Sequence, residues 1–411
     1  MDCRHCKQPL KTVFVDLDRS PPSNAYVKDV NAPEASFPLR VLVCTNCWLV
    51  QTEDYAAADE LFEEDYAYFS SYSPSWLDHS KRYVEAMIDR FGLTHDNTVV
   101  EVAANDGYLL QYVLAAGVPC YGVEPTASTA AVAREKGIDI VEEFFGVALG
   151  ERLAAEGRRA DLTAANNVLA HVPDINDFVG GFAALLTEQG VSTFEFPHLG
   201  LLVSEGLFDT IYHEHYSYLS LTAVDRIFRE NGLAVFDVEK LTTHGGSLRV
   251  YAQRADTGNH QRTAAVEQLL AEEAQAGVST AAYYEGFQER VDTIRAGLLA
   301  FLDQAEADGK TVAAYGAAAK GNTLLNYSGV TADRVAFVVD ANPHKQGQYL
   351  PGSHVPIVDE SVLKEEQPDF VLVLPWNLMA EISSQLHYIS GWDGQLVRAV
   401  PELQISEPTA S

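Results

Sequence analysis

The chain has 411 residues, and its 28 basic and 58 acidic side chains give a net charge of −30 at neutral pH. This acidity argues against a nucleic-acid or anionic-membrane partner, because little on the surface neutralises phosphates. The length predicts two or three domains, and a hydrophobic content of 47% is enough for full cores. No apolar run approaches the ~20 residues of a membrane span. Residues 1–6 lack a signal-peptide layout, so we expect a soluble, cytoplasmic protein.

Four of the five cysteines lie near the N-terminus as two pairs, Cys3-x-x-Cys6 and Cys44-x-x-Cys47. Each pair offers two thiolates from one tight turn, and two such pairs complete a tetrahedron around Zn²⁺. Disulfides are not expected in a cytoplasmic protein. Four thiolates leave no open coordination position, so the predicted Zn²⁺ is structural. The alternative is two packed pairs of reduced cysteines.

Tyrosines and serines crowd residues 63–76, which include Tyr66, Tyr72 and Ser73. A tyrosine ring offers a flat apolar face and a hydroxyl group, which suits a sugar. An interdomain linker whose aromatic rings fill the seam explains the composition equally well. Residues 79–91 then form a predicted amphipathic helix.

A strand–turn–helix–strand unit follows, with strands at 98–103 and 121–123, a turn at 105–107 and a helix at 108–116. Such a turn lets the backbone approach a nucleotide, and Glu124, at the end of the second strand, suits ribose hydroxyls. Ala103 and Asn105 replace the glycines of a dinucleotide site, and Asp106 would repel a pyrophosphate. S-adenosylmethionine (SAM), which carries a sulfonium, therefore fits better than NAD. The alternative is a βαβ unit without a ligand.

Further strands are predicted at 139–141, 161–165, 191–196, 232–238 and 247–253. Five strands separated by helices, followed by a strand pair, are typical of a class I SAM-methyltransferase sheet. Ligands of such sheets lie beyond the carboxyl ends of the strands. The residues expected to contact SAM are Glu101, Ala103, Asn105, Asp106, Gly107, Glu124, Pro125, Phe145 and Asn167.

The richest chemistry lies after the fifth strand, in Tyr212-His213-Glu214-His215-Tyr216. Two histidines two residues apart suit an extended segment and not the helix of a zinc protease. A general base is the better interpretation, because the reference pKa of histidine, about 6.5, suits proton transfer near neutral pH. The alternative is a polar surface loop. His171, after the fourth strand, is a second candidate, although a cap or a satisfied core histidine explains it equally well.

Residues 263–305 are predicted to form one or two long helices. A second α/β unit follows, with strands at 311–315, 335–340, 369–374 and 395–400. Its turn of small residues at 316–323 includes Lys320 and suits a diphosphate. It is not a P-loop, because the second glycine follows the lysine. The alternative is a packing domain with a lysine in solvent. We therefore predict three domains: a zinc-binding domain at 1–65, a SAM domain at 66–254, and a Rossmann-like domain at 255–411.

Several motifs together resemble the sugar 3-C-methyltransferases of antibiotic deoxysugar pathways. The resemblance runs nearly end to end and is carried by the paired cysteines and by residues 101–107, 166–174, 212–216, 244–249 and 315–321. It implies a zinc-binding N-terminal domain, a central SAM domain, and a C-terminal domain that helps to hold a TDP-sugar. The implied reaction places a methyl group on C3 of a TDP-linked 4-keto-deoxysugar, commonly a 3-amino sugar.

The C3 proton of such a sugar is acidic because it lies beside the C4 ketone. His215 is the first choice as base, with Glu214 orienting it or sharing the proton. Tyr212, Tyr66 and His171 are candidates for stabilising the enolate oxygen. The residues expected to contact the substrate are Tyr72, Ser73, His244, Arg249, Lys320 and Asn322.

Three other functions stay open at this point: an O- or N-methyltransferase, a nucleotide-sugar oxidoreductase, and a non-catalytic zinc-ribbon protein that senses SAM. The oxidoreductase is disfavoured by the incomplete glycine motif of the C-terminal unit. The acidic charge disfavours a regulator that binds DNA. Nothing in the sequence demands an oligomer, and a monomer is expected.

Overall fold

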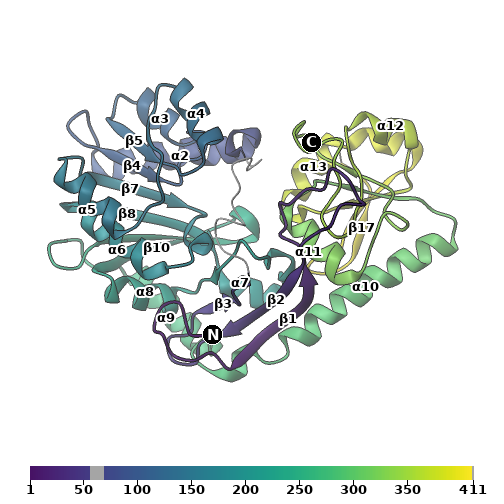
Figure 1. Cartoon of the computed structure of the whole chain (residues 1–411), viewed down its shortest axis with the longest axis horizontal. Coiled ribbons are helices and arrows are strands. Elements are labelled where there is room, and N and C mark those ends of the chain that lie inside the picture. The colour runs from purple at the N-terminus through teal and green to yellow at the C-terminus, as the bar shows by residue number, and fades with distance from the viewer. Residues whose placement is uncertain (56–68, 410–411) are drawn as a thin grey trace.

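The computed structural model describes residues 1–55 and 69–409. The described chain forms three β-sheets, which follow one another along the sequence with one exchange of a strand. Figure 1 shows the methyltransferase-like sheet and the C-terminal sheet side by side, with β1 and β2 at the lower middle and helix α10 below the C-terminal part. Among the helices that the structure describes, none combines the length and apolar character needed to span a membrane.

The N-terminal sheet is antiparallel, with the strand order β1-β2-β3-β9. Its strands are β1 Thr12–Ser20, β2 Phe37–Val43, β3 Val50–Thr52 and β9 Ser217–Tyr218. Strand β9 was not predicted; it comes from the middle of the chain and directly follows the segment that carries His215. The N-terminal sheet therefore includes the two residues that come directly after the His215 segment.

The central sheet has the strand order β10-β11-β8-β7-β4-β5-β6, and β11 alone runs antiparallel to the other strands. This order confirms the class I SAM-methyltransferase fold. Its strands are β4 Val99–Val102, β5 Cys120–Val123, β6 Asp139–Val141, β7 Ala160–Asn166, β8 Leu186–Pro197, β10 Leu233–Leu241 and β11 Ser247–Arg254. All four residues of β4 are buried, as a central parallel strand requires.

Helices cover both faces of the central sheet. One face packs against α2 Pro74–Phe91, α3 Leu110–Ala115 and α4 Ala127–Glu135. The other packs against α5 Val147–Ala155, α6 Ile175–Leu185, α8 Leu221–Glu230 and α9 Ala264–Ala276. Helix α7, Leu199–Glu205, follows β8, and short 3₁₀ turns lie at η1 Ser70–Tyr72, η2 Leu169–His171, η3 Phe208–Thr210 and η4 Thr243–Gly245.

The C-terminal sheet has the order β14-β13-β12-β15-β16-β17, and its strands are parallel except for β17. Its strands are β12 Val312–Tyr315, β13 Val338–Val339, β14 Ile357–Val358, β15 Phe370–Val373, β16 Gln395–Arg398 and β17 Gln404–Ser406. Its helices are α10 Phe287–Ala307, α11 Ala319–Ser328, α12 Ser361–Glu366 and α13 Met379–Gln385, with 3₁₀ turns η5 Ala281–Tyr284, η6 Trp376–Leu378 and η7 His387–Trp392. This is the predicted Rossmann-like unit, and the helical region before it is two helices, α9 and α10.

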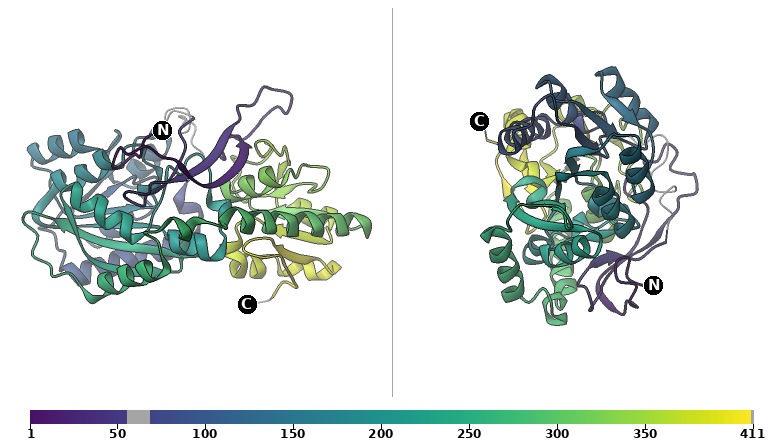
Figure 2. Two further views of the ribbon diagram at one scale, coloured as in Figure 1. Left: turned by 90° about the horizontal axis from the view of Figure 1, so that it is seen from below. Right: turned by 90° about the vertical axis from the view of Figure 1, so that its left-hand side faces the viewer.

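The N-terminal strands join the two larger units. One hydrophobic core combines β1 and β2 with α7, α10 and α11, and another includes the cysteines and the central sheet. Figure 2 shows these strands lying across the junction between the central and C-terminal parts. Each of these cores contains residues from both sides of positions 65 and 254, so the three-domain division at those positions stays a prediction.

Candidate active site

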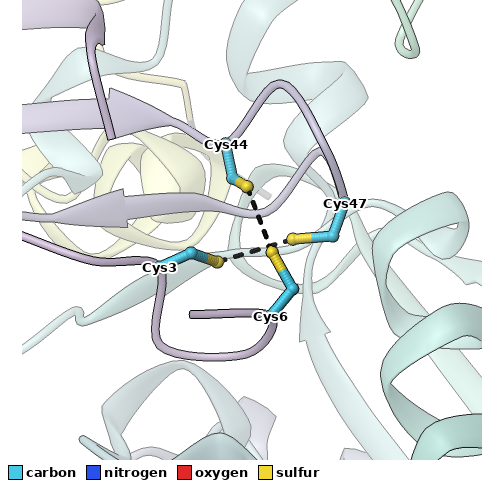
Figure 3. A group of neighbouring side chains, drawn as sticks. All are labelled: Cys3, Cys6, Cys44 and Cys47. Carbon is cyan, nitrogen blue, oxygen red and sulfur yellow. Dashed lines mark hydrogen bonds between the residues drawn. The ribbon is translucent and has the colours of Figure 1, made fainter. Parts of the chain in front are cut away.

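The four N-terminal cysteines converge on one point (Figure 3). Their Sγ atoms all lie within 4.8 Å of one another, and Cys3–Cys47 and Cys6–Cys44 are each 3.5 Å apart. Zn–S bonds of about 2.3 Å in a tetrahedron separate the sulfurs by about 3.8 Å. Burial raises the pKa of the Cys44 thiol, so a bound cation is needed to stabilise four thiolates there. The donor set fits structural Zn²⁺.

The loop after β4 is shaped for close approach of a ligand. Ala103, Asn105 and Gly107 adopt left-handed φ values of 59°, 49° and 76°. At Gly107 a Cβ would lie 2.5 Å from the side chain of Ile138, so only glycine fits the turn. These bends turn the backbone sharply at the carboxyl end of the central strand, which suits the SAM cradle of this fold.

Glu124 holds this loop in place. Its two carboxylate oxygens accept hydrogen bonds from the backbone amides of Asn105 and Thr126, each at 2.9 Å. Burial raises the pKa of Glu124. Each oxygen keeps a second lone pair, which a ribose hydroxyl can use. The position predicted from sequence is therefore suited both to shape the loop and to bind the ribose.

The other residues predicted to contact SAM pair or pack with neighbouring side chains, or are buried or half-buried. Asp106 is neutralised by Lys136, whose Nζ lies 3.6 Å from its carboxylate, so it does not present the free charge expected from sequence. Glu101 is completely buried, and burial raises its pKa well above the usual value. Phe145 packs on Phe182 with ring centroids 4.7 Å apart. Pro125 directly follows Glu124 and is half-buried.

Asn166 ends strand β7 and Asn167 follows it, and their side chains differ in their contacts. The side chain of Asn167 donates to His244 Nε2 at 2.9 Å, and its backbone has a left-handed φ of 54°. Asn166 is buried, yet neither its Oδ1 nor its Nδ2 has a hydrogen-bond partner in the described part of the chain. Such an unpaired amide at the carboxyl end of a parallel strand indicates a ligand contact. The sequence prediction named only Asn167, although the Asn-Asn pair at a strand end was the available signal.

His215 is held as a neutral base. Its Nδ1 lies 2.7 Å from the carbonyl oxygen of Thr210 and must donate, so Nε2 accepts the hydroxyl of Tyr212 at 2.8 Å. Burial, followed by the ring of His171, lowers the pKa of His215 well below its usual value. The two histidine rings are 4.5 Å apart. His215 therefore keeps a basic lone pair at neutral pH.

The extended conformation predicted for this segment is wrong. Residues 212–215 form a turn closed by a hydrogen bond from His215 N to Tyr212 O at 2.9 Å, which stacks the two rings 4.0 Å apart. The side chains in the middle of the turn, His213 and Glu214, bond to the N-terminal segment and not to His215. Glu214 Oε1 accepts from the backbone and side chain of Asn24 at 3.2 and 3.1 Å, and His213 donates to Pro38 O at 3.2 Å.

This turn gives the orienting role to Thr210 and not to Glu214. Glu214 Oε2 is buried without a hydrogen-bond partner among the residues described, and burial raises the pKa of this carboxyl group. Glu214 is thus a candidate for carrying a proton. His171 donates from Nδ1 to Glu214 O at 2.8 Å, and burial lowers the pKa of His171 to about 4.

The predicted substrate residues occupy different places. His244 lines the same small pocket as His215. Its ring is edge-on to Trp76 with centroids 5.2 Å apart, and burial lowers its pKa to about 4. Arg249 is buried in ion pairs with Glu195 and Glu239, at 3.1 and 3.2 Å, which account for its charge.

Three more of these residues face solvent or make structural hydrogen bonds. Tyr72 is 57% exposed, Ser73 caps helix α2 by accepting from Trp76 N at 3.3 Å, and Asn322 donates to Ser23 O. Tyr66 lies outside the described residues.

Lys320, from the C-terminal unit, lies close enough to His215 and His244 for its charge to act on both. Lys320 Nζ lies 4.5 Å from the ring centroid of Trp376, whose Nε1 donates to Asp209 Oδ2 at 2.6 Å. Burial raises the pKa of Asp209 to about 6 and lowers that of Lys320. The charge of Lys320 helps to lower the pKa values of His215 and His244. Asp209 and Trp376 had not been predicted from sequence.

The strand order, the loop held by Glu124 and the four-cysteine site define a SAM-dependent methyltransferase with a zinc-binding N-terminal domain. Three family models match in order: a zinc binding domain at residues 3–62, a methyltransferase domain at 76–238, and a C-methyltransferase C-terminal domain at 242–401. The chain belongs to the C-methyltransferase family. C-methyltransferase NovU from Streptomyces niveus is 34% identical over 406 residues, which cover 98% of this chain and 96% of that protein.

Solved structures resemble only part of the chain. Magnesium protoporphyrin IX methyltransferase from Synechocystis PCC 6803, with bound SAM, is 15% identical, covers 44% of this chain and 79% of its own, and gives a TM-score of 0.34. The 1,6-didemethyltoxoflavin-N1-methyltransferase of Burkholderia thailandensis is 17% identical, with coverages of 51% and 96% and a TM-score of 0.37. At these scores neither bears on the substrate.

Proposed function

We propose that this C-methyltransferase transfers the methyl group of SAM to C3 of a TDP-linked 4-keto-deoxysugar, with a 3-amino-4-keto-6-deoxysugar as the first substrate to test. The observation that carries the proposal is the neutral, buried imidazole of His215 in the cleft. Carbon methylation beside a ketone requires removal of a C–H proton, and a neutral imidazole whose Nε2 accepts the Tyr212 hydroxyl can take that proton through the hydroxyl.

The proposed reaction has two chemical steps. The Tyr212–His215 pair takes the C3 proton, and the electrons of the C3–H bond form the C3=C4 double bond of an enolate. The negative charge then resides on O4. SAM, when bound, supplies a methyl group on a positively charged sulfur, and the C3–methyl bond forms as the methyl–sulfur bond breaks. The sulfur keeps the electron pair.

The surroundings of His215 support the first step. Its low pKa keeps it unprotonated before the substrate arrives, and a doubly negative TDP group in the cleft would raise that pKa and so strengthen the base. Tyr212 donates its hydroxyl proton to Nε2, so its oxygen can accept the C3 proton as Nε2 takes the hydroxyl proton; the hydroxyl would stabilise O4 only after turning away from Nε2. His171, beside His215, is the second candidate for stabilising the enolate oxygen.

Lys320 is proposed to bind the diphosphate. A chain with a net charge of −30 needs a local cation for a TDP group, and Lys320 is the cation whose charge reaches both His215 and His244. The indole ring of Trp376 lies against the ammonium group of Lys320 and offers a flat surface next to the proposed diphosphate site. Zn²⁺ at the four-cysteine site is structural in this account, because four thiolates leave no coordination position for a substrate.

Exchange of the C3 hydrogen tests the proposal. The TDP-3-amino-4-keto-6-deoxysugar is incubated in D₂O with the protein and the demethylated cofactor product, and NMR follows the C3 signal. Enzyme-dependent loss of that signal is expected. A C3 signal that decays no faster with the protein than in the enzyme-free control would contradict the proposal.

A further inference from the structure

Strand β3 connects the four-cysteine site to the segment that carries His215. Gln51, completely buried in this strand, donates from Nε2 to Cys3 Sγ at 3.3 Å and accepts the backbone amide of Arg4 at 2.8 Å. On its other side the same strand pairs with β9, where Gln51 lies opposite Ser217. One buried residue thus contacts both a metal ligand and the strand that follows His215.

Thr52, the next residue, binds the backbone of His215 directly. Its hydroxyl donates to His215 O at 2.5 Å, and its amide donates to the carbonyl oxygen of Tyr216 at 3.1 Å. Thr52 is 1% exposed, so water cannot replace these bonds. Together with Thr210, which holds the ring at Nδ1, Thr52 fixes both the backbone and the imidazole of His215.

Arg4 lies between two metal ligands, Cys3 and Cys6, and reaches the same segment. Its guanidinium lies 4.6 Å from the ring centroid of Tyr216 and donates to Thr52 O at 3.1 Å. It also donates to Pro173 O at 3.2 Å, two residues beyond His171. The turn between the first two cysteines therefore supports both histidine segments.

We propose that the metal-binding N-terminal segment is a positioning device for the catalytic base, and that Thr52 is the positioning residue through which it acts. This proposal rests on the assignment of His215 as the base. Misplacement of a catalytic group by about 1 Å can cost about 100-fold in rate. Binding of metal by Cys3 and Cys6 fixes Arg4 and Gln51, which in turn hold β3 against the His215 segment.

The test compares three variants of the full, zinc-loaded chain. Thr52→Val keeps the shape of the side chain and removes its hydroxyl; kcat for methyl transfer is expected to fall about 10- to 100-fold, with KM and zinc content unchanged. Thr52→Ser restores the hydroxyl and should recover activity to within about threefold of wild type. Thr163→Val is the matched control, because Thr163 is equally buried in a strand and donates to Ser192 Oγ at 2.6 Å away from this path.

A direct measurement on the ring separates this proposal from the proposed function. ¹⁵N-histidine NMR reports the hydrogen bond at Nδ1 of His215, and the signal is assigned by its loss in His215→Asn. A shift of this signal in Thr52→Val, and none in Thr163→Val, supports positioning even if no sugar is methylated at carbon. An unchanged signal and a kcat within twofold of wild type overturn it, as does an equal loss of kcat in Thr163→Val.

Discussion

Replacing His215 with asparagine tests the base assignment quantitatively. The imidazole is buried and its pKa is well below the usual value, so at pH 7.5 all of it is in the basic form. The variant therefore loses the whole contribution of the base, which for general-base catalysis is about 100- to 10,000-fold. At 1.36 kcal/mol for each factor of ten, this is about 2.7–5.4 kcal/mol of barrier.

The assay is the rate of C3 hydrogen exchange in D₂O, followed by NMR with saturating sugar. SAM affinity and zinc content serve as controls, because the cradle around Glu124 and the cysteine site contain no atom of His215. Loss of exchange by at least 100-fold with both controls unchanged is the expected result. An exchange rate above one tenth of wild type would refute the reasoning.

Three more predictions concern pH, substrate and cofactor. The pKa values of His171 and His244 are lowered to about 4 and that of His215 also lies below 6.5, so their neutral forms persist as the pH falls. The pH profile of kcat/KM, which reports the protein before the TDP group binds, should stay flat from pH 8 to 6, and a half-loss near 6.5 would contradict this. Lys320→Met should raise KM for the TDP-sugar about 10- to 100-fold, from a lost charged hydrogen bond, and leave the Kd for SAM unchanged in calorimetry. Glu124→Ala should weaken SAM about tenfold or more in the same titration, with zinc retained; unaltered affinity would remove Glu124 from the cofactor site.

Local patterns predicted much of the fold. Buried strands such as Val99–Val102, separated by helices and followed by a strand pair, predicted the central sheet, because each pattern depends on residues close in sequence. The paired cysteines predicted their own convergence, since a shared metal constrains them whatever the intervening chain does.

The rest depends on contacts between distant residues. Strand β9 has only two residues, too few for a pattern, and it exists because Val50 and Gln51 of β3 pair with it. The hydrogen bond between Asp209 and Trp376 joins residues 167 positions apart, so no spacing in the sequence indicates it. The turn at 212–215 replaced the expected extended segment because it stacks Tyr212 on His215, a gain that hydrophobic periodicity does not record.

The position of the transferred methyl group tests the central claim most directly. The protein is incubated with SAM bearing a deuterated methyl group and the TDP-3-amino-4-keto-6-deoxysugar, and NMR and mass spectrometry locate the label. A deuterated methyl group bonded to C3, with loss of the C3 hydrogen, is the predicted result. A label on oxygen or nitrogen, with the C3 hydrogen retained, would contradict carbon methylation of this sugar.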